Sequence, residues 1–329
     1  MRAFIAFLLV FTASSITWAK AGAPVPLILD TDIGNDIDDA LALAMIHGLE
    51  SRGEVKLIAV TITKDNKWAA PYVDLVNTFY GRPDIPIGVV HNGKTPQNSA
   101  YIMKPSEDRD SGGKYVYPHR LLSGADAPDA GKVLRAALEK QPDDSVVIAQ
   151  IGFSTNLARF LQSPGGRDIA AKKIKLLVFM AGNFQKPDPE YNVYTDPASA
   201  GYLFKNWPTP MVFSGFEIGL QVKFTHESIV NDFGYIAHHP IAEAYNLYLP
   251  KGEDRPSWDP TAVLYAIRPD RGYFQLSQSG NVTLGPKNTT IFTPAAKGKC
   301  RYLILPAGGA GRVVAVLQAL ASQPPKCAF

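Results

Sequence analysis

The chain has 329 residues, of which 46% are hydrophobic and 19% are charged, with a formal net charge of +3. This length and composition are sufficient for one large α/β domain with a substantial core. The positive excess is small, and no run of five or more like charges occurs, which argues against dedicated nucleic-acid binding.

Residues 1–21 are predicted to form an export signal. Arg2 gives a positive start, the stretch 3–11 is apolar, and Ala19-Lys20-Ala21 offers a small-residue cleavage site. A membrane anchor is the alternative, but the apolar stretch is short for a bilayer span. We therefore expect an exported protein, periplasmic or secreted, with no membrane attachment after cleavage. The remaining residues, 22–329, are predicted to form a single domain.

Short apolar runs alternate with segments of helical periodicity along this domain. The predicted strands span 26–29, 55–62, 85–90, 145–151, 174–180 and 211–214, and the predicted helices span 36–50, 67–80, 131–140, 156–162 and 197–206. Alternation of continuously apolar strands with helices predicts an open, mostly parallel sheet with helices on both faces. Ligands bind such sheets beyond the carboxyl ends of the strands.

The first strand leads into an acidic loop at residues 30–39. It contains five aspartates: Asp30, Asp32, Asp36, Asp38 and Asp39. Their mutual repulsion favours a bound cation, and hard oxygen ligands suit Ca²⁺ or Mg²⁺. Helix capping by Asp36, with Asp38 and Asp39 near the helix N-terminus, is the structural alternative, but it leaves Asp30 and Asp32 unexplained. The loop therefore predicts a divalent-metal site, with Ca²⁺ favoured.

Several motifs, in order along residues 26–274, together resemble the inosine–uridine-preferring nucleoside hydrolases. They are ILDTDIG (28–34) followed by DDALA (38–42), STNLA (154–158), GNF (182–184), PEYNV (189–193) with DP (196–197), and WDPTAV (258–263). The resemblance implies the α/β fold of that family and a homo-oligomer. It also implies hydrolysis of the N-glycosidic bond of a ribonucleoside or a related small N-riboside, giving ribose and a free base.

The same resemblance assigns roles to individual residues. It implies that Ca²⁺ is held by Asp32, Asp39, the backbone carbonyl of Thr155, and Asp259, together with sugar hydroxyls and one water. Asp32 would also be the general base that takes a proton from the attacking water. Contacts to the substrate are implied for Asp38, Asn66, Asn183, Glu190, Asn192 and Trp258. Two of these have structural alternatives, since Asn66 could cap the second helix and Asn183 could be a turn residue.

The sequence departs from the family at two places. The acidic loop is two residues longer, which makes Asp36 a competitor of Asp38 and Asp39, and Trp258 replaces a histidine that helps the base to leave. Tryptophan can stack on a ring but gives no proton at ordinary pH. Other donors in loops are Glu107, Asp108, Arg109, Asp110, Tyr115, Tyr117, His119, Tyr245 and Arg255.

Three alternatives remain open from the sequence. A noncatalytic nucleoside- or ribose-binding protein would keep the pocket without turnover. A haloacid-dehalogenase-like phosphatase would explain Asp30-Thr31-Asp32, although Gly34 occupies a position where that class has Thr or Val. Cys300 and Cys327 either form a disulfide or remain thiols.

Overall fold

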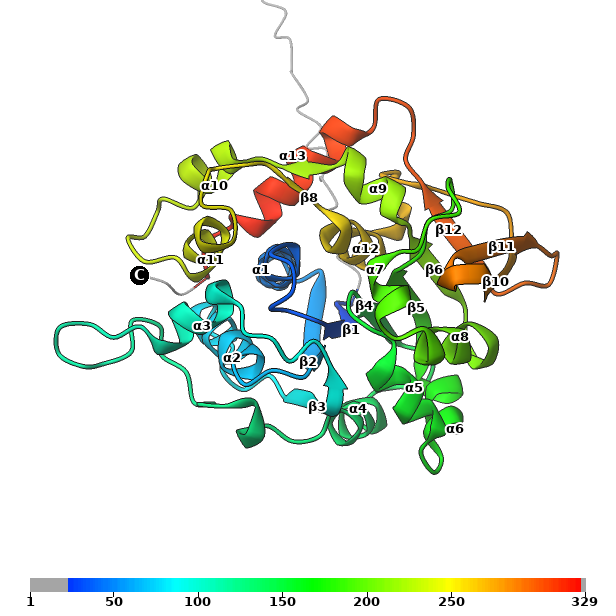
Figure 1. The fold of residues 1–329 in the computed structure, drawn as a ribbon, viewed down its shortest axis with the longest axis horizontal. Helices are drawn as coiled ribbons and strands as arrows, with labels where there is room; N and C mark the ends of the chain where they lie inside the picture. Colours follow the sequence, from blue (N-terminus) through cyan, green and yellow to red (C-terminus); the bar gives the residue numbers. More distant parts are fainter. Residues whose placement is uncertain (1–22, 327–329) are drawn as a thin grey trace, which may run out of the picture.

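The computed structural model describes residues 23–326. Its centre is a ten-stranded sheet in the order β11-β10-β12-β6-β5-β4-β1-β2-β3, with β9 paired to β12 (Figure 1). The strands are β1 (Val25–Thr31), β2 (Val55–Lys64), β3 (Ile87–Lys94), β4 (Val146–Gln150), β5 (Ile174–Met180), β6 (Met211–Ser214), β9 (Gln275–Leu276), β10 (Gly280–Leu284), β11 (Thr290–Pro294) and β12 (Cys300–Ile304). A separate pair joins β7 (Lys223–Phe224) to β8 (Arg255–Pro256).

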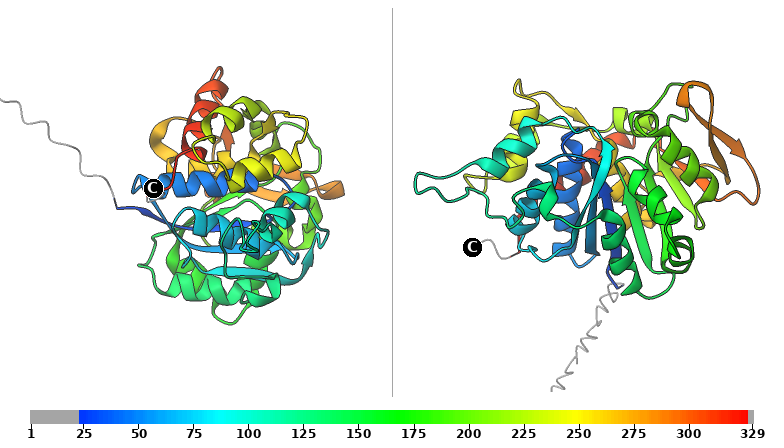
Figure 2. Two further views of the ribbon diagram at one scale, coloured as in Figure 1. Left: turned by 90° about the vertical axis from the view of Figure 1, so that its left-hand side faces the viewer. Right: turned by 60° about the horizontal axis from the view of Figure 1, so that its bottom comes forward.

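Seven adjacent strands of the large sheet run parallel, from β12 through β6, β5, β4, β1 and β2 to β3. Antiparallel pairing in this sheet involves β9, β10 and β11, and the separate β7–β8 pair is also antiparallel. Helices cover both faces (Figure 2). Because successive side chains of a strand point to opposite faces, Leu27 and Leu29 join one core, and Ile28 joins the other. The predicted α/β class with a mostly parallel sheet is therefore confirmed.

The first core holds buried side chains of α1 (Asp38–Ser51), α2 (Ala69–Phe79), α11 (Pro240–Tyr248), α12 (Trp258–Ile267) and α13 (Ala310–Ala321). The second core holds those of α4 (Ala130–Glu139), α5 (Thr155–Gln162), α6 (Gly166–Lys173) and α8 (Pro197–Asn206). The remaining helices are α3 (Ala100–Glu107), α7 (Tyr191–Thr195), α9 (Phe216–Gln221) and α10 (His226–Asp232).

The segment between the first strand and the first helix is shifted by two residues relative to the prediction, because β1 ends at Thr31 instead of residue 29 and α1 begins at Asp38 instead of residue 36. Gly34 takes a φ of +111°, which only glycine adopts easily, and the backbone N–H of Asn35 bonds back to the carbonyl of Asp32. The residue before the helix is Ile37, and no side chain caps this end. The alternative in which Asp36 caps the helix is therefore wrong.

The parallel strands bring their carboxyl ends to one edge of the sheet, where β1, β4 and β5 lead into polar loops. No helix within residues 23–326 is long and apolar enough to cross a membrane. The predicted export signal and Cys327 lie outside the described residues, and Cys300 is buried in β12.

Candidate active site

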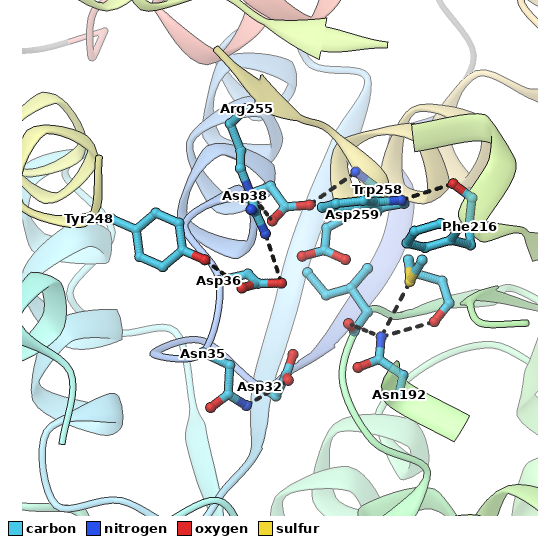
Figure 3. A network of polar contacts seen from close by, with 12 residues as sticks. Asp32, Asn35, Asp36, Asp38, Asn192, Phe216, Tyr248, Arg255, Trp258 and Asp259 are labelled. Atoms are coloured by element: carbon cyan, nitrogen blue, oxygen red, sulfur yellow. Dashed lines mark hydrogen bonds and ion pairs between the residues drawn. The ribbon is translucent and has the colours of Figure 1, made fainter. Parts of the chain in front are cut away.

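A cavity of about 70 Å³ opens at this edge of the sheet. Its wall combines acidic side chains, an amide, two apolar side chains from strand ends, and three aromatic rings. The lining residues are Asp32, Asp36, Asp38, Asp39, Ile151, Met180, Glu190, Tyr191, Asn192, Phe216, Trp258 and Asp259. The acidic loop, the ends of β4 and β5, and the first turns of α7, α9 and α12 therefore meet around one space (Figure 3).

Asp38 joins the acidic loop to α12. One of its carboxylate oxygens accepts hydrogen bonds from the backbone N–H groups of Trp258 at 3.0 Å and Asp259 at 3.2 Å. These N–H groups belong to the first turn of α12, where a helix has unsatisfied donors and favours negative charge. The contact spans 221 residues of sequence and places the Asp259 side chain beside the acidic loop.

The carboxylates of the cavity are incompletely paired. Thr31 donates its hydroxyl to one oxygen of Asp39, and Asn35 donates its amide to one oxygen of Asp32 at 2.7 Å. The second oxygen of Asp39 and the second oxygen of Asp38 have no hydrogen-bond partner although both are buried. Arg255 lies 3.7 Å from the Asp38 oxygen, but no protein cation within residues 23–326 pairs with the Asp39 oxygen. A buried carboxylate oxygen without a partner is costly, so the Asp39 oxygen calls for an external positive group.

Burial and like charge perturb these acids strongly. Burial, followed by the charges of Asp36 and Asp38, raises the pKa of Asp32 to about 7. Burial likewise raises the pKa of Asp38 to about 6, although Arg255 opposes the shift. The pKa values of Asp39 and Asp259 lie well above the ordinary range, because burial is reinforced by the neighbouring carboxylates.

The donor set fits a hard cation. Four buried carboxylates, at Asp32, Asp38, Asp39 and Asp259, face one cavity. The residues that line it include no cysteine and no histidine, so the available ligands are mainly hard oxygen atoms. Within residues 23–326, no three His, Cys, Asp or Glu side chains converge closely enough to enclose an ion by themselves. A bound cation would therefore also need oxygen atoms from the backbone, substrate or water.

The opposite wall carries Glu190 and Asn192, at the start of α7. The Glu190 carboxylate accepts from the backbone N–H groups of Gly182 at 3.1 Å, Asn192 at 2.8 Å and Val193 at 3.2 Å, and burial raises its pKa to about 7. Asn192 donates its amide to the carbonyls of Ile151 at 3.0 Å and Met180 at 3.1 Å. These bonds fix both side chains against the ends of β4 and β5.

Comparison with known proteins identifies the family. The family model described as inosine-uridine preferring nucleoside hydrolase matches residues 27–315. The chain belongs to this family. It is a hydrolase that acts on N-glycosyl compounds, and ribonucleosides are its substrate class. The alternative of a haloacid-dehalogenase-like phosphatase is therefore wrong.

Individual relatives agree with this family. The pyrimidine-specific ribonucleoside hydrolase RihA of Shewanella sp. (strain MR-4) is 27% identical over 262 residues, which cover 74% of this chain and 78% of the relative. Among solved structures, the plant nucleoside hydrolase PpNRh1 has a TM-score of 0.66 at 21% identity, covering 92% of this chain and 100% of that one. The type III effector protein XopQ, in complex with adenosine diphosphate ribose, has a TM-score of 0.66 at 16% identity, covering 92% and 93%.

Three residues that the resemblance assigns to this nucleoside hydrolase's site do not line the cavity. Asn66 donates to the carbonyls of Pro96 and Gln97 and accepts from the N–H of Trp68 just before α2. The side-chain oxygen of Asn183 accepts from two backbone N–H groups of its own turn, at 3.0 and 3.2 Å. The hydroxyl of Thr155 donates to Asp196 at 2.5 Å. Asn183 is therefore a turn residue, as its structural alternative predicts, whereas no side chain caps α2, so the capping alternative for Asn66 is wrong. The assignment of Thr155 concerns its backbone carbonyl and stays a prediction.

The sequence interpretation missed part of the cavity wall. Phe216 stacks on Trp258 with ring centroids 5.4 Å apart, and the Trp258 indole donates to the Phe216 carbonyl at 2.9 Å. Phe216, Ile151 and Met180 all lie at or just beyond strand ends, so the rule that ligands bind there would have identified them.

Arg255 is the one residue among the sequence's candidate donors that reaches the acidic loop. Its guanidinium lies 2.9 Å from Asp36 and 3.7 Å from Asp38, and it packs over the rings of Tyr248 and Trp258 (Figure 3). Tyr248 donates its hydroxyl to Asp36 at 2.7 Å. In contrast, Tyr117 bonds to Glu243, and Arg109 packs over Tyr115, so neither side chain contributes to the cavity.

Proposed function

We propose that this nucleoside hydrolase is Ca²⁺-dependent and cleaves ribonucleosides to ribose and free base with Asp32 as the general base. The observation that carries the proposal is the cavity in which Asp32, Asp38, Asp39 and Asp259 are buried together with two unpaired oxygens. Such a concentration of negative charge matches a divalent cation and, next to it, a substrate whose sugar becomes positively charged as it reacts.

The proposed ligands of Ca²⁺ are Asp32, Asp39, the backbone carbonyl of Thr155, and Asp259. Asp39 has one oxygen held by Thr31 and one without a partner, and Asp259 points into the same cavity from α12. When bound, Ca²⁺ would acidify a water molecule and orient the sugar diol.

Asp32 would take the proton of the attacking water. Its carboxylate is buried, one oxygen is fixed by Asn35, and the other stays available to accept a proton. Asp38, Glu190 and Asn192 would contact sugar hydroxyls from opposite walls of the cavity. Asn66 and Asn183 remain proposed substrate contacts by resemblance, although neither lines the cavity.

Departure of the nucleobase would depend on its packing against the aromatic residues of the cavity. Trp258 has no proton to donate at neutral pH, but with Phe216 it presents stacked aromatic surface at the cavity. The relatives named pyrimidine-specific ribonucleoside hydrolase support pyrimidine ribonucleosides as the first substrates to examine.

The experiment is a reducing-sugar assay with uridine, cytidine, inosine, adenosine and nicotinamide riboside, after removal of metal and with Ca²⁺ or Mg²⁺ added back. We expect release of ribose from at least one pyrimidine riboside, loss of activity with chelator, and recovery with Ca²⁺. No release from any riboside in the presence of Ca²⁺ would contradict the proposal and favour a ribose-binding protein.

We also propose that residues 1–21 direct export, that 22–329 fold as one domain, and that the mature protein is a homo-oligomer. The amino-terminal pattern of charge, apolar stretch and small residues supports the first point. N-terminal sequencing of the exported protein should begin close to residue 22, and light scattering should give a multiple of the monomer mass.

A further inference from the structure

Lys64 ends β2 with its ammonium group buried close to the acidic cavity. The residue is 2% exposed, and its Nζ donates to the side-chain oxygen of Asn35 at 2.7 Å and to the carbonyl of Thr95 at 2.7 Å. Lysine is almost never buried without a paired charge or hydrogen bonds, since desolvating its ammonium is costly. Neither of its two hydrogen-bond partners is a carboxylate, and one of them, Asn35, in turn contacts Asp32.

Asn35 lies between Lys64 and Asp32, and its amide is satisfied on both sides. Its Nδ2 donates to the carboxylate of Asp32 at 2.7 Å and to the hydroxyl of Thr95 at 3.2 Å, while its oxygen accepts from Lys64. A lysine ammonium only donates, and an ionised carboxylate only accepts. Rotating the amide by half a turn would therefore place NH₂ against NH₃⁺ and oxygen against carboxylate. Lys64 thus leaves Asn35 one orientation, with its NH₂ group toward Asp32.

We propose that Lys64 is a positioning residue that locks Asn35 so that it holds one carboxylate oxygen of Asp32 and leaves the other for catalysis. This inference rests on the proposed function, because it assigns Asp32 to the attacking water.

Two simpler roles make different predictions. Lys64 could only anchor the segment after β3 through the Thr95 carbonyl, in which case its loss would act independently of Asn35. It could instead act only by charge, since Asp32 and Asp39 both raise its pKa against the lowering effect of burial. Removing a cation beside acids would then strengthen binding of Ca²⁺, whereas losing the orientation of Asp32 would weaken it.

A double-mutant cycle separates these roles. The variants are Lys64→Met, which keeps the unbranched stem that packs near Gly34, Asn35→Leu on the half-buried loop, and the combination of both. For uridine hydrolysis we expect each single change to lower kcat about tenfold with KM altered less than about threefold, since each breaks the chain of charge-assisted hydrogen bonds from Lys64 through Asn35 to Asp32. The double variant should be no slower than the slower single variant, because both changes break the same chain of contacts.

The second measurement is Ca²⁺ binding by calorimetry on the same proteins. We expect both single variants to bind Ca²⁺ more weakly, by about threefold, and the double variant to match them. The control is Lys173→Met, because Lys173 also donates to a backbone carbonyl, that of Gln141 at 2.7 Å, but from α6. It should retain both wild-type kcat and wild-type Ca²⁺ affinity.

The proposal is overturned if Lys64→Met keeps kcat within about twofold, if the two effects multiply to about a hundredfold, or if Lys64→Met binds Ca²⁺ more tightly. If the wild-type enzyme binds Ca²⁺ but cleaves no riboside, the proposed function fails, and the calorimetric cycle alone decides whether Lys64 acts through Asn35. If it neither cleaves nor binds Ca²⁺, both proposals are wrong.

Discussion

The two ends of α1 carry acids in opposite circumstances. At its N-terminus, Asp38 and Asp39 are buried in the cavity, and their pKa values are raised. At its C-terminus, Glu50 is paired with Arg82 and His47, and its pKa is lowered, because these hydrogen bonds and the N–H of Leu57 overcome the effect of burial. The helix dipole alone would favour acids at the N-terminus and disfavour them at the C-terminus.

The neighbouring helix α12 repeats the contrast. Asp259 lies in its first turn, in the cavity, with a raised pKa, whereas Arg268 just beyond its last turn holds Glu54 through two hydrogen bonds of 2.6 and 2.7 Å. Burial therefore outweighs the dipole for the acids at the N-terminal ends of α1 and α12, and pairing outweighs it for Glu50 at the C-terminal end of α1. Glu50 and Glu54 each receive a cation from the protein. In the cavity Arg255 serves Asp36 and Asp38, whereas Asp39 and Asp259 have no ion pair with a protein cation among the described residues.

Asp32→Asn tests this contrast at its strongest point. We expect the change to lower kcat by about a thousandfold, because the base is lost while the cavity keeps its shape. Steady-state hydrolysis of the preferred riboside measures the effect. Asp84→Asn, at an exposed aspartate before β3, should keep full activity. Full activity in Asp32→Asn would contradict the assignment of Asp32 as the general base.

The contrast extends to amides. Asn192 lines the cavity, whereas the oxygen of Asn183 is already used by two backbone N–H groups. We expect Asn192→Ala to lower kcat/KM about tenfold and Asn183→Ala to change it less than about threefold, since the latter mainly loosens a turn. Equal losses in both variants would restore Asn183 to the substrate contacts that the resemblance implies.

The thermal stability of the metal-free protein should depend on pH because the Asp32 carboxylate is buried in the cavity. Asp32 has a pKa of about 7 in the folded protein against an ordinary value of 3.8, so the folded state binds more protons between these values. Its ionisation therefore destabilises the fold fully above pH 7, and the penalty disappears as pH falls toward 4. In chelator, we expect Asp32→Asn to melt about 5 °C above wild type at pH 8.

That difference should shrink steadily between pH 7 and pH 4, measured by scanning fluorimetry with both proteins in the same buffers. Because both share every other titrating group, the comparison isolates the residue that was changed. A melting-temperature difference that stays constant across this range would mean that burial does not raise the pKa of Asp32. Saturating Ca²⁺ should stabilise the wild type relative to the variant and so reverse the order at pH 8.

Glu54→Gln removes the acid that Arg268 holds at the C-terminal end of α12, and it has the smallest expected effect of these changes. Its ion pair with Arg268 is partly exposed, so after solvent screening we expect a loss of about 0.5 kcal/mol in the free energy of unfolding. The contribution of Glu54 should be present above the ordinary glutamate pKa of 4.5 and be lost below it, because its folded pKa is lowered. Chemical denaturation at pH 7 measures the loss of stability. We expect kcat to be unchanged, and a lowered kcat would contradict a purely structural role for Glu54.

The sequence by itself determined the class of the fold and the acidic edge. Apolar runs at β1, β2, β4 and β5, interrupted by helical periodicity, identify a parallel sheet covered on both faces. The end of β5 at Met180 and the bounds of α8 agree with the prediction to the residue, because Pro197 and the following polar turns mark them locally. The density of aspartates after β1 likewise needs no tertiary contact to be noticed.

Only the tertiary structure decided how side chains are used. Asp38 meets the first turn of α12 across 221 residues, and Arg255 reaches Asp36, through contacts that no local periodicity encodes. The amide of Asn183 turns toward its own loop while that of Asn192 faces the cavity, although both follow β5. Spacing along a chain fixes which segments form strands and helices, but the direction of a side chain in a loop depends on the donors and acceptors that folding brings beside it.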